Sequence, residues 1–182
     1  MADRILEAFL ARQQVAGLAL AEESDLLDLL PIGSPADRYL VELRCKGLVE
    51  RSPGDVIEAE RFQIGIRFPS TYLRTANPFQ VLTWLGPHNV WHPNISATDP
   101  VICIGRLAPG TELVDILYQV FEIVTWNKVT MREDDALNAA ACQWARRHGD
   151  RFPVDRRPLK RRRMPLRVAD VSEQGENHGT SV

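Results

Sequence analysis

The apolar residues of the chain recur with one period before residue 103 and with another after it. Between residues 38 and 85, apolar and polar residues alternate in three runs, the pattern of half-buried β-strands. These runs cover residues 38–50, 60–68 and 79–85, and turn-forming residues separate them at 51–55 and 69–78. Three strands in succession, each separated by a turn or loop, predict an antiparallel meander with helices gathered at its ends.

Helical periodicity marks two other segments, and a further apolar stretch lies between them. Residues 3–13 predict an amphipathic helix, and residues 24–32 form a second apolar stretch that includes Pro31. Residues 111–126 predict a helix with Thr111 as its N-cap. Its apolar stripe comprises Leu113, Ile116, Leu117, Val120, Phe121 and Val124.

A last helix is expected to begin at Asp134 or Asp135 and to end at Gly149. Its apolar face would carry Leu137, Ala140, Ala141 and Trp144. Prolines and basic residues are frequent over residues 153–167, and residues 169–182 are polar and weakly acidic. We therefore expect a catalytic or binding domain over residues 1–152 and a basic, mostly disordered tail over residues 153–182.

Composition restricts the classes of function. The 182 residues carry a formal net charge of −2, which argues against a nucleic-acid or membrane-surface partner. No run of 18 apolar residues and no signal peptide is evident, so we expect a cytoplasmic protein. The cysteines and histidines lack the spacing of metal ligands or of a disulfide framework, and we expect neither a metal nor a cofactor.

The stretch WHPNISATDPVICIG, residues 91–105, raises the question of what Cys103 does. A lone cysteine between two isoleucines is usually an inert apolar residue in a strand. We assign Cys45 and Cys142 to the core. The four tryptophans, Trp84, Trp91, Trp126 and Trp144, are expected to pack rather than to bind bases.

The order of motifs resembles that of the ubiquitin-conjugating enzymes over residues 40–148. The matching segments are Phe62 to Tyr72, Pro78, the HPNI turn from His92 to Ile95, the ICI triplet from Ile102 to Ile104, and DDALNAAA from Asp134 to Ala141. The resemblance implies an α+β fold in which an antiparallel meander sheet of about four strands is flanked by an N-terminal helix and C-terminal helices.

The resemblance also implies a function. Cys103 would accept a ubiquitin-like protein from an activating enzyme as a thioester and pass it to a lysine of a protein substrate, which suits the acyl-exchange chemistry of a thiolate. Asn94 would donate a hydrogen bond to the oxyanion, and His92 and Pro93 would shape the turn that holds Asn94. Asp135 would orient the incoming amine, with Asp134 as the next candidate. Ordinary capping of a helix by an acidic residue is the other interpretation of Asp135.

Several features depart from the family. The spacing from His92 to Cys103 is one residue longer than the commonest one, and RLAPGTEL, residues 106–113, replaces the loop that RING and HECT ligases contact. The N-terminal segment also differs from the family's basic first helix. Together with the predominance of arginine over lysine, these departures make the chain more similar to the bacterial relatives of the family. Some of those relatives serve in antiphage defence. A GC-rich genome also explains the arginine bias, and so would protection from self-modification, although Lys128 and Lys160 remain as acceptors.

Two rival functions stand beside the carrier enzyme. A catalytically inactive module of the same fold would only bind a ubiquitin-like protein, but such variants typically lack the cysteine. A cysteine hydrolase would need a histidine general base, and neither His88 nor His92 has an obvious orienting acid. The basic tail has three interpretations: a solvated extension, a docking segment for the activating enzyme or an acidic target, and a nucleic-acid contact.

Overall fold

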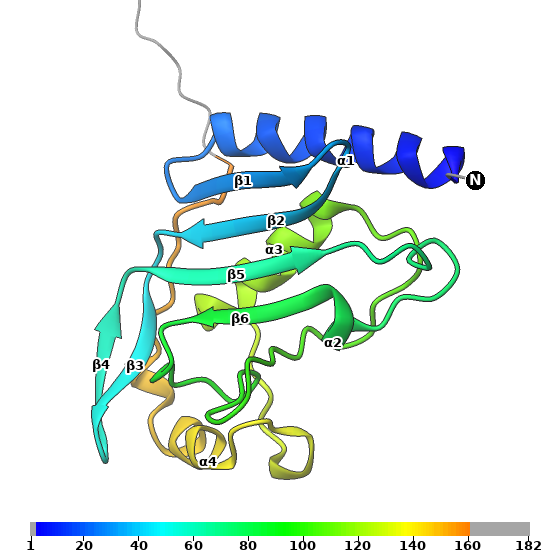
Figure 1. The fold of residues 1–182 in the computed structure, drawn as a ribbon. Coiled ribbons are helices and arrows are strands. Elements are labelled where there is room, and N and C mark those ends of the chain that lie inside the picture. Colours follow the sequence, from blue (N-terminus) through cyan, green and yellow to red (C-terminus); the bar gives the residue numbers. More distant parts are fainter. Residues whose placement is uncertain (1–2, 161–182) are drawn as a thin grey trace, which may run out of the picture.

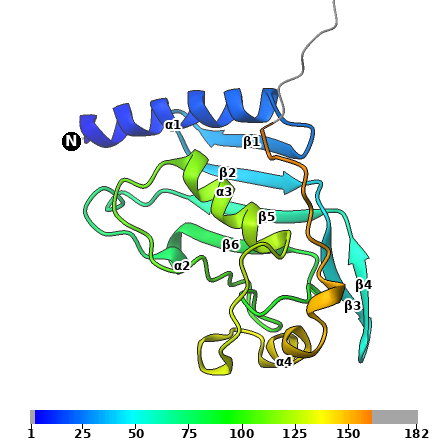
Figure 2. The same cartoon turned by 180° about the vertical axis from the view of Figure 1, so that it is seen from behind.

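A four-stranded antiparallel sheet forms the centre of the fold in a computed structural model that describes residues 3–160. The strand order is β1-β2-β5-β6, α3 crosses one face of the sheet, and α1 lies along the β1 edge (Figure 1, Figure 2). The elements are α1 (Arg4–Glu22), β1 (Leu27–Gly33), β2 (Ala36–Leu43), β3 (Gly47–Ser52), β4 (Asp55–Ala59), β5 (Phe62–Arg67), α2 (Pro78–Val81), β6 (Leu82–Gly86), α3 (Leu113–Val124), η1 (Glu133–Asp135), α4 (Ala139–Arg147) and η2 (Gly149–Arg151). The predicted α+β architecture is confirmed.

The single strand predicted over residues 38–50 is wrong, because the chain forms two strands there. β2 ends at Leu43, and β3 pairs with β4 in a separate hairpin inserted between β2 and β5. The break lies beside Gly47, where a Cβ atom would approach Cζ of Phe62 to 2.5 Å and the carbonyl oxygen of Val124 to 2.9 Å. Only a glycine lets the backbone pass so close to Phe62.

Two other segments differ from their predicted form. The apolar stretch over residues 24–32 becomes the edge strand β1, where Pro31 is tolerated opposite Tyr39. The strand predicted over residues 79–85 begins instead with the short helix α2. Asn77 caps this helix by accepting a hydrogen bond from the Phe79 amide at 3.0 Å, and Pro78 occupies its first turn.

Helix α1 continues well beyond the predicted residues 3–13. Asp3 caps it, and its buried stripe extends to Gly17 and Leu20. A Cβ atom at Gly17 would lie 2.7 Å from Cδ2 of Leu113, so this glycine allows α1 to pack closely against α3. The tertiary contact with α3 therefore extends α1 past the point where its amphipathic pattern weakens.

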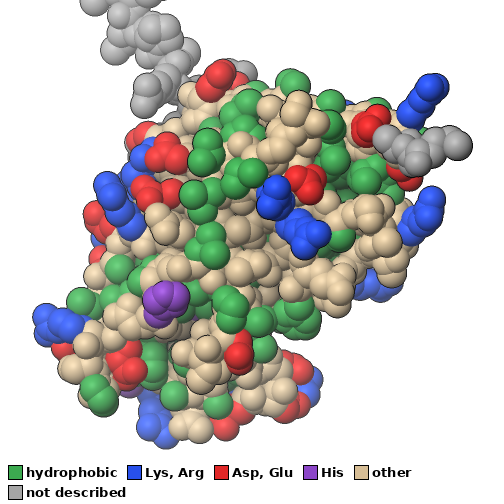
Figure 3. Space-filling view, in the orientation of Figure 1, with side chains coloured by type: hydrophobic (Ala, Val, Ile, Leu, Met, Phe, Trp, Pro, Cys, Tyr) green, Lys and Arg blue, Asp and Glu red, His purple; other side chains and the backbone are tan. Residues whose placement is uncertain are grey.

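The core lies between the sheet and α3. The inward residues of β5, from Phe62 to Ile66, and the predicted apolar stripe of α3 are buried, and so are Cys45, Trp84 and Trp126. The opposite face of the sheet bears exposed apolar side chains, among them Leu30, Ile32, Leu40 and Leu85 (Figure 3). No helix among residues 3–160 is both long and apolar enough to span a membrane.

Residues 153–160 pack against the domain, so the predicted boundary at residue 152 falls within a folded segment. This segment runs from the α4 end of the molecule back towards α1 (Figure 2). Asp155 is buried, pairs with Arg157 at 2.6 Å and accepts a hydrogen bond from the Lys46 amide at 3.1 Å. These bonds hold the pKa of Asp155 near 2. Leu159 joins the main core, and the rest of the predicted tail, residues 161–182, lies outside the described residues.

The packing of Leu159 yields a stability prediction. Leu159 is 1% exposed, so Leu159→Ala should lower the free energy of unfolding by about 2–5 kcal/mol, the usual cost of emptying a core leucine site. Val154, 41% exposed in the same segment, serves as the control, and Val154→Ala should change that free energy by about 0.5 kcal/mol or less. Urea unfolding followed by circular dichroism measures both, and equal losses would contradict the packed segment.

Candidate active site

The HPNI turn lies after β6 and is closed by its own histidine. The Asn94 amide donates to Nδ1 of His92 at 3.0 Å, and the Ile95 amide donates to the carbonyl oxygen of His92 at 3.1 Å. Because Nδ1 accepts a hydrogen bond from a backbone N–H, the neutral ring carries its proton on Nε2. His92 is 1% exposed, and its ring meets the Trp126 ring edge-on with centroids 4.6 Å apart.

Burial determines the charge of His92. It lowers the pKa of His92 to about 3, because a buried imidazolium loses its hydration without gaining a compensating partner. Nε2 is itself buried and has no hydrogen-bond partner among the described residues. At neutral pH the ring is therefore an uncharged structural group.

Cys103 lies on the strand-like segment that pairs with this turn. Ile95 and Ile102 form an antiparallel bridge, and the Cys103 amide donates to the carbonyl oxygen of Asn94 at 2.8 Å. Ile102 and Ile104 are buried, whereas Cys103 is partly exposed. In the loop that joins the two segments, the Ser96 hydroxyl accepts hydrogen bonds from the Thr98 and Asp99 amides.

The side chain of Asn94 joins three parts of the chain. Its Nδ2 donates to the carbonyl oxygen of Cys103 at 3.2 Å and to the Thr130 hydroxyl at 2.9 Å, while its Oδ1 accepts from the Thr130 amide at 2.9 Å. Thr130 belongs to the loop between α3 and η1. The amide group thus ties the HPNI turn both to the Cys103 segment and to this loop.

Pro93 connects the turn to α4. Its carbonyl oxygen accepts hydrogen bonds from the Leu137 amide at 2.9 Å and the Asn138 amide at 3.2 Å. Asn138 is the N-cap of α4 and accepts from the Ala141 amide at 3.0 Å. The prediction of Asp134 or Asp135 as this cap is wrong, since both lie in η1. The buried face of α4 is also shifted to Ala141, Cys142 and Ala145, with Ala140 exposed.

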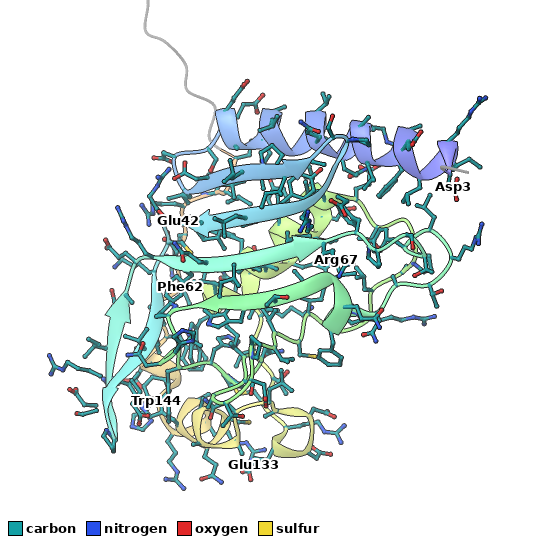
Figure 4. The ribbon with its side chains drawn as sticks, in the orientation of Figure 1. Asp3, Glu42, Phe62, Arg67, Glu133 and Trp144 are labelled. Carbon is teal, nitrogen blue, oxygen red and sulfur yellow. The ribbon has the colours of Figure 1, made fainter. Side chains whose placement is uncertain are left out.

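Both aspartates of η1 are exposed and share one cation. Asp134 binds Arg132 at 2.6 Å, and this hydrogen bond lowers the pKa of Asp134, while Asp135 lies 3.3 Å from Nε of Arg132. The neighbouring backbone is held by Arg146, which donates to the carbonyl oxygen of Met131 and pairs with Glu133 at 2.8 Å. Figure 4 marks this region by Glu133 on η1 and Trp144 on α4.

Solved structures with a similar fold are named ubiquitin-conjugating enzymes. A protein described as a novel ubiquitin-conjugating enzyme has 17% sequence identity and a TM-score of 0.54, covering 80% of this chain and 88% of its own. The E2 domain of a Toxoplasma gondii ubiquitin-conjugating enzyme has 16% identity and a TM-score of 0.47, covering 77% of this chain and 91% of its own. No family model matches the sequence, and no curated protein does.

The chain has the ubiquitin-conjugating-enzyme fold. The first of these structures supports that assignment over most of both chains. On this fold the three cysteines are chemically distinct. Burial raises the pKa of Cys45 to about 12 and also raises that of Cys142, whose thiol faces the carbonyl oxygen of Thr130 at 3.5 Å. Cys103 is the partly exposed thiol among the described residues, which contain no cluster of His, Cys, Asp or Glu suited to a metal ion.

Motif matching found His92, Pro93, Asn94 and Cys103, and the structure brings these four together. It missed Thr130, which joins the HPNI turn to the following loop, and it gave no role to Asn138, whose amide joins the turn to α4. Asn138 lies within the matched DDALNAAA segment, and an asparagine before an alanine-rich run is itself a helix-capping signal. Thr130 offers no such signal, because its partner is distant in sequence.

The low pKa of His92 predicts a pH-dependent stability. Between about pH 6.5 and pH 3 the unfolded histidine binds a proton that the folded one does not, so acid should lower the free energy of unfolding. One such group contributes up to about 1.4 kcal/mol per pH unit. Urea unfolding at a series of pH values should therefore show a shallower slope for His92→Gln than for the wild type. Parallel curves would contradict a buried neutral His92.

Proposed function

We propose that this protein is a carrier enzyme that holds a ubiquitin-like protein as a thioester on Cys103 and transfers it to an amine of a protein substrate. The observation that carries the proposal is the position of Cys103. It is a partly exposed thiol, fixed through its backbone N–H and C=O to the Asn94 residue of the HPNI turn. The fold supports the same class of function.

The proposed chemistry has two acyl transfers at one sulfur. The Cys103 thiolate attacks the thioester carbonyl on the activating enzyme, whose own cysteine leaves as a thiolate, so one C–S bond replaces another. A lysine amine then attacks the new thioester, the bond to Sγ of Cys103 breaks, and the amine nitrogen gives up its proton. The product is an amide, and no metal, redox cofactor or histidine base is required.

The burial of His92 separates this proposal from a cysteine hydrolase. A hydrolase of that kind needs a histidine that takes the thiol proton. His92 has its Nδ1 committed to the Asn94 amide, and its pKa is near 3. His92 is thus supported as a shaping residue of the turn, together with Pro93, whose carbonyl oxygen anchors the start of α4.

Asn94 is proposed as the donor to the oxyanion that forms during each transfer. Both hydrogens of its amide already have acceptors, the carbonyl oxygen of Cys103 and the Thr130 hydroxyl. Stabilising an oxyanion therefore requires one of these bonds to be exchanged for the new acceptor. The bond to Thr130 is the suitable one, because the bond to Cys103 keeps the amide beside the nucleophile.

Asp135 is proposed to orient the incoming amine, with Asp134 as the second candidate. An exposed carboxylate attracts a lysine ammonium and can accept its proton. Asp134 is held by two hydrogen bonds from Arg132, at 2.6 and 3.2 Å, whereas Asp135 makes a single ion pair at 3.3 Å. Asp135 is consequently the carboxylate that is easier to free from Arg132.

The partners are proposed from the departures in sequence. The loop over residues 106–113 lacks the segment that RING and HECT ligases contact. A bacterial conjugation system in the cytoplasm, with its own activating enzyme and ubiquitin-like protein, therefore fits better than a eukaryotic one. Antiphage defence is the proposed setting. An inactive module that only binds a ubiquitin-like protein is the alternative, and the exposed Cys103 argues against it.

Loading of Cys103 tests the proposal directly. The wild-type protein, mixed with ATP and the activating enzyme and ubiquitin-like protein encoded beside it, should form an adduct that a thiol reductant cleaves. Cys103→Ser should form an ester that resists reductant, and Cys103→Ala should form no adduct. Cys142→Ala serves as the control because that thiol is buried. Non-reducing gels and intact mass spectrometry follow the adducts, and no wild-type adduct with a charged activating enzyme would favour the binding module.

The role of Asn94 is tested by a pair of variants. Asn94→Ala should slow discharge of the loaded protein to free lysine by about 100-fold or more, as for loss of an oxyanion donor. Thr130→Val removes the competing hydroxyl acceptor but keeps the backbone N–H that holds Oδ1. It should discharge at least as fast as the wild type. A comparable slowing in both variants would show that Asn94 acts only by joining the loops.

A further inference from the structure

Lys128 contacts the backbone immediately after Cys103. Its ammonium nitrogen lies 2.6 Å from the carbonyl oxygen of Ile104, a short charge-assisted hydrogen bond. The other two lysines form ion pairs elsewhere, Lys46 with Glu58 at 3.4 Å and Lys160 with Glu23 at 2.7 Å. Among the residues that the structure describes, Lys128 has no carboxylate within ion-pair distance, so its charge is directed to this carbonyl group.

The end of α3 fixes the position of the Lys128 backbone. Trp126 adopts a left-handed conformation with φ of 62°, which is uncommon for a bulky residue and reverses the chain after the helix. The Trp126 amide donates to the carbonyl oxygen of Ile123, and the Lys128 amide donates to that of Glu122, both at 2.9 Å. The backbone of Lys128 is therefore anchored to the last turn of α3, and its side chain spans from there to Ile104.

The ammonium group lies close to Gly105 as well as to Ile104. Ile102 and Ile104 point into the core, whereas Cys103 is partly exposed and Gly105 is exposed. A Cβ atom placed on Gly105 would be 3.8 Å from Nζ of Lys128. The amine thus lies beside the backbone of the two residues that follow Cys103.

The chain after Cys103 has little else to hold it. At Cys103 itself, Asn94 binds both the amide and the carbonyl group. Across residues 104–107, the bond from Lys128 is the one hydrogen bond found within the described part of the chain. Gly105, with φ of 90°, then turns the backbone away. Loss of the Lys128 bond would leave residues 104–107 without a hydrogen bond to the rest of the described chain.

We propose that Lys128 is a positioning residue for Cys103. It clamps the carbonyl group that follows the cysteine, so that the sulfur keeps its direction when a large acyl group is attached. This role rests on the proposed carrier function, in which the thioester carbonyl must stay within reach of both Asn94 and the attacking amine. Small displacements of a reacting group can cost about 100-fold in rate, so a clamp on this flank affects the transfer step.

Discharge of the loaded protein tests the clamp. Wild type, Lys128→Met and Lys128→Arg are first loaded with the ubiquitin-like protein, and single-turnover discharge is measured over a range of free lysine concentrations. Methionine has similar length but no donor, so the rate constant at saturating lysine should fall about tenfold without a change in the half-saturating concentration. Arginine also donates to a carbonyl group and should restore the rate to within about twofold of the wild type.

Hydrogen exchange supplies a readout that does not depend on loading. The Cys103 amide, which donates to the carbonyl oxygen of Asn94, should exchange faster in Lys128→Met than in the wild type, while the amides of α1 should be unchanged. Equal exchange and equal discharge in the two proteins would overturn the clamp and leave the carrier function intact. Failure of the wild type to load at all would overturn the carrier function and this role with it. A reductant-resistant adduct on Lys128 itself would also overturn the clamp, because it would make Lys128 an acceptor.

Discussion

The arrangement of the candidate active site depends on the side-chain amide of Asn94. Its three hydrogen bonds reach the Cys103 backbone and both the hydroxyl and the amide of Thr130, so one group joins the HPNI turn, the nucleophile segment and the loop after α3. These bonds are largely shielded from water, and an unpaired partner in such a place costs about 1–3 kcal/mol. The position of the thiol is accordingly coupled to the packing of α3 and α4.

Differences in burial give the histidine of the turn and the three cysteines different protonation states and different accessibility. His92 stays neutral because its ring is enclosed by Trp126 and by its own turn, and Cys45 and Cys142 stay protonated because burial raises the pKa of each thiol. Cys103 is left as the accessible sulfur. The proposed acyl exchange needs such an accessible thiol and oriented donors, whereas hydrolysis of the cysteine-protease kind relies on an imidazole base.

The sequence predicted those features of the structure that depend on neighbouring residues. It predicted poorly those that depend on contacts between residues far apart in the chain. Alternation identified the strands β2, β5 and β6, and the motifs identified His92, Pro93, Asn94 and Cys103. The partition of residues 38–50 depends on the passage of Gly47 beneath Phe62, which no local pattern encodes. In the same way Thr130 and Lys128 act through partners 36 and 24 residues away, and Leu159 is buried only because residues 153–160 return across the domain.

The most direct test of this account is the reactivity of the three thiols in the folded protein. The native protein is treated briefly with iodoacetamide, and each cysteine is quantified by peptide mass spectrometry against a urea-unfolded sample. The account predicts that Cys103 is alkylated while Cys45 and Cys142 remain unmodified until the protein unfolds. Protection of Cys103 to the same degree as the two buried cysteines would contradict its presentation as a nucleophile.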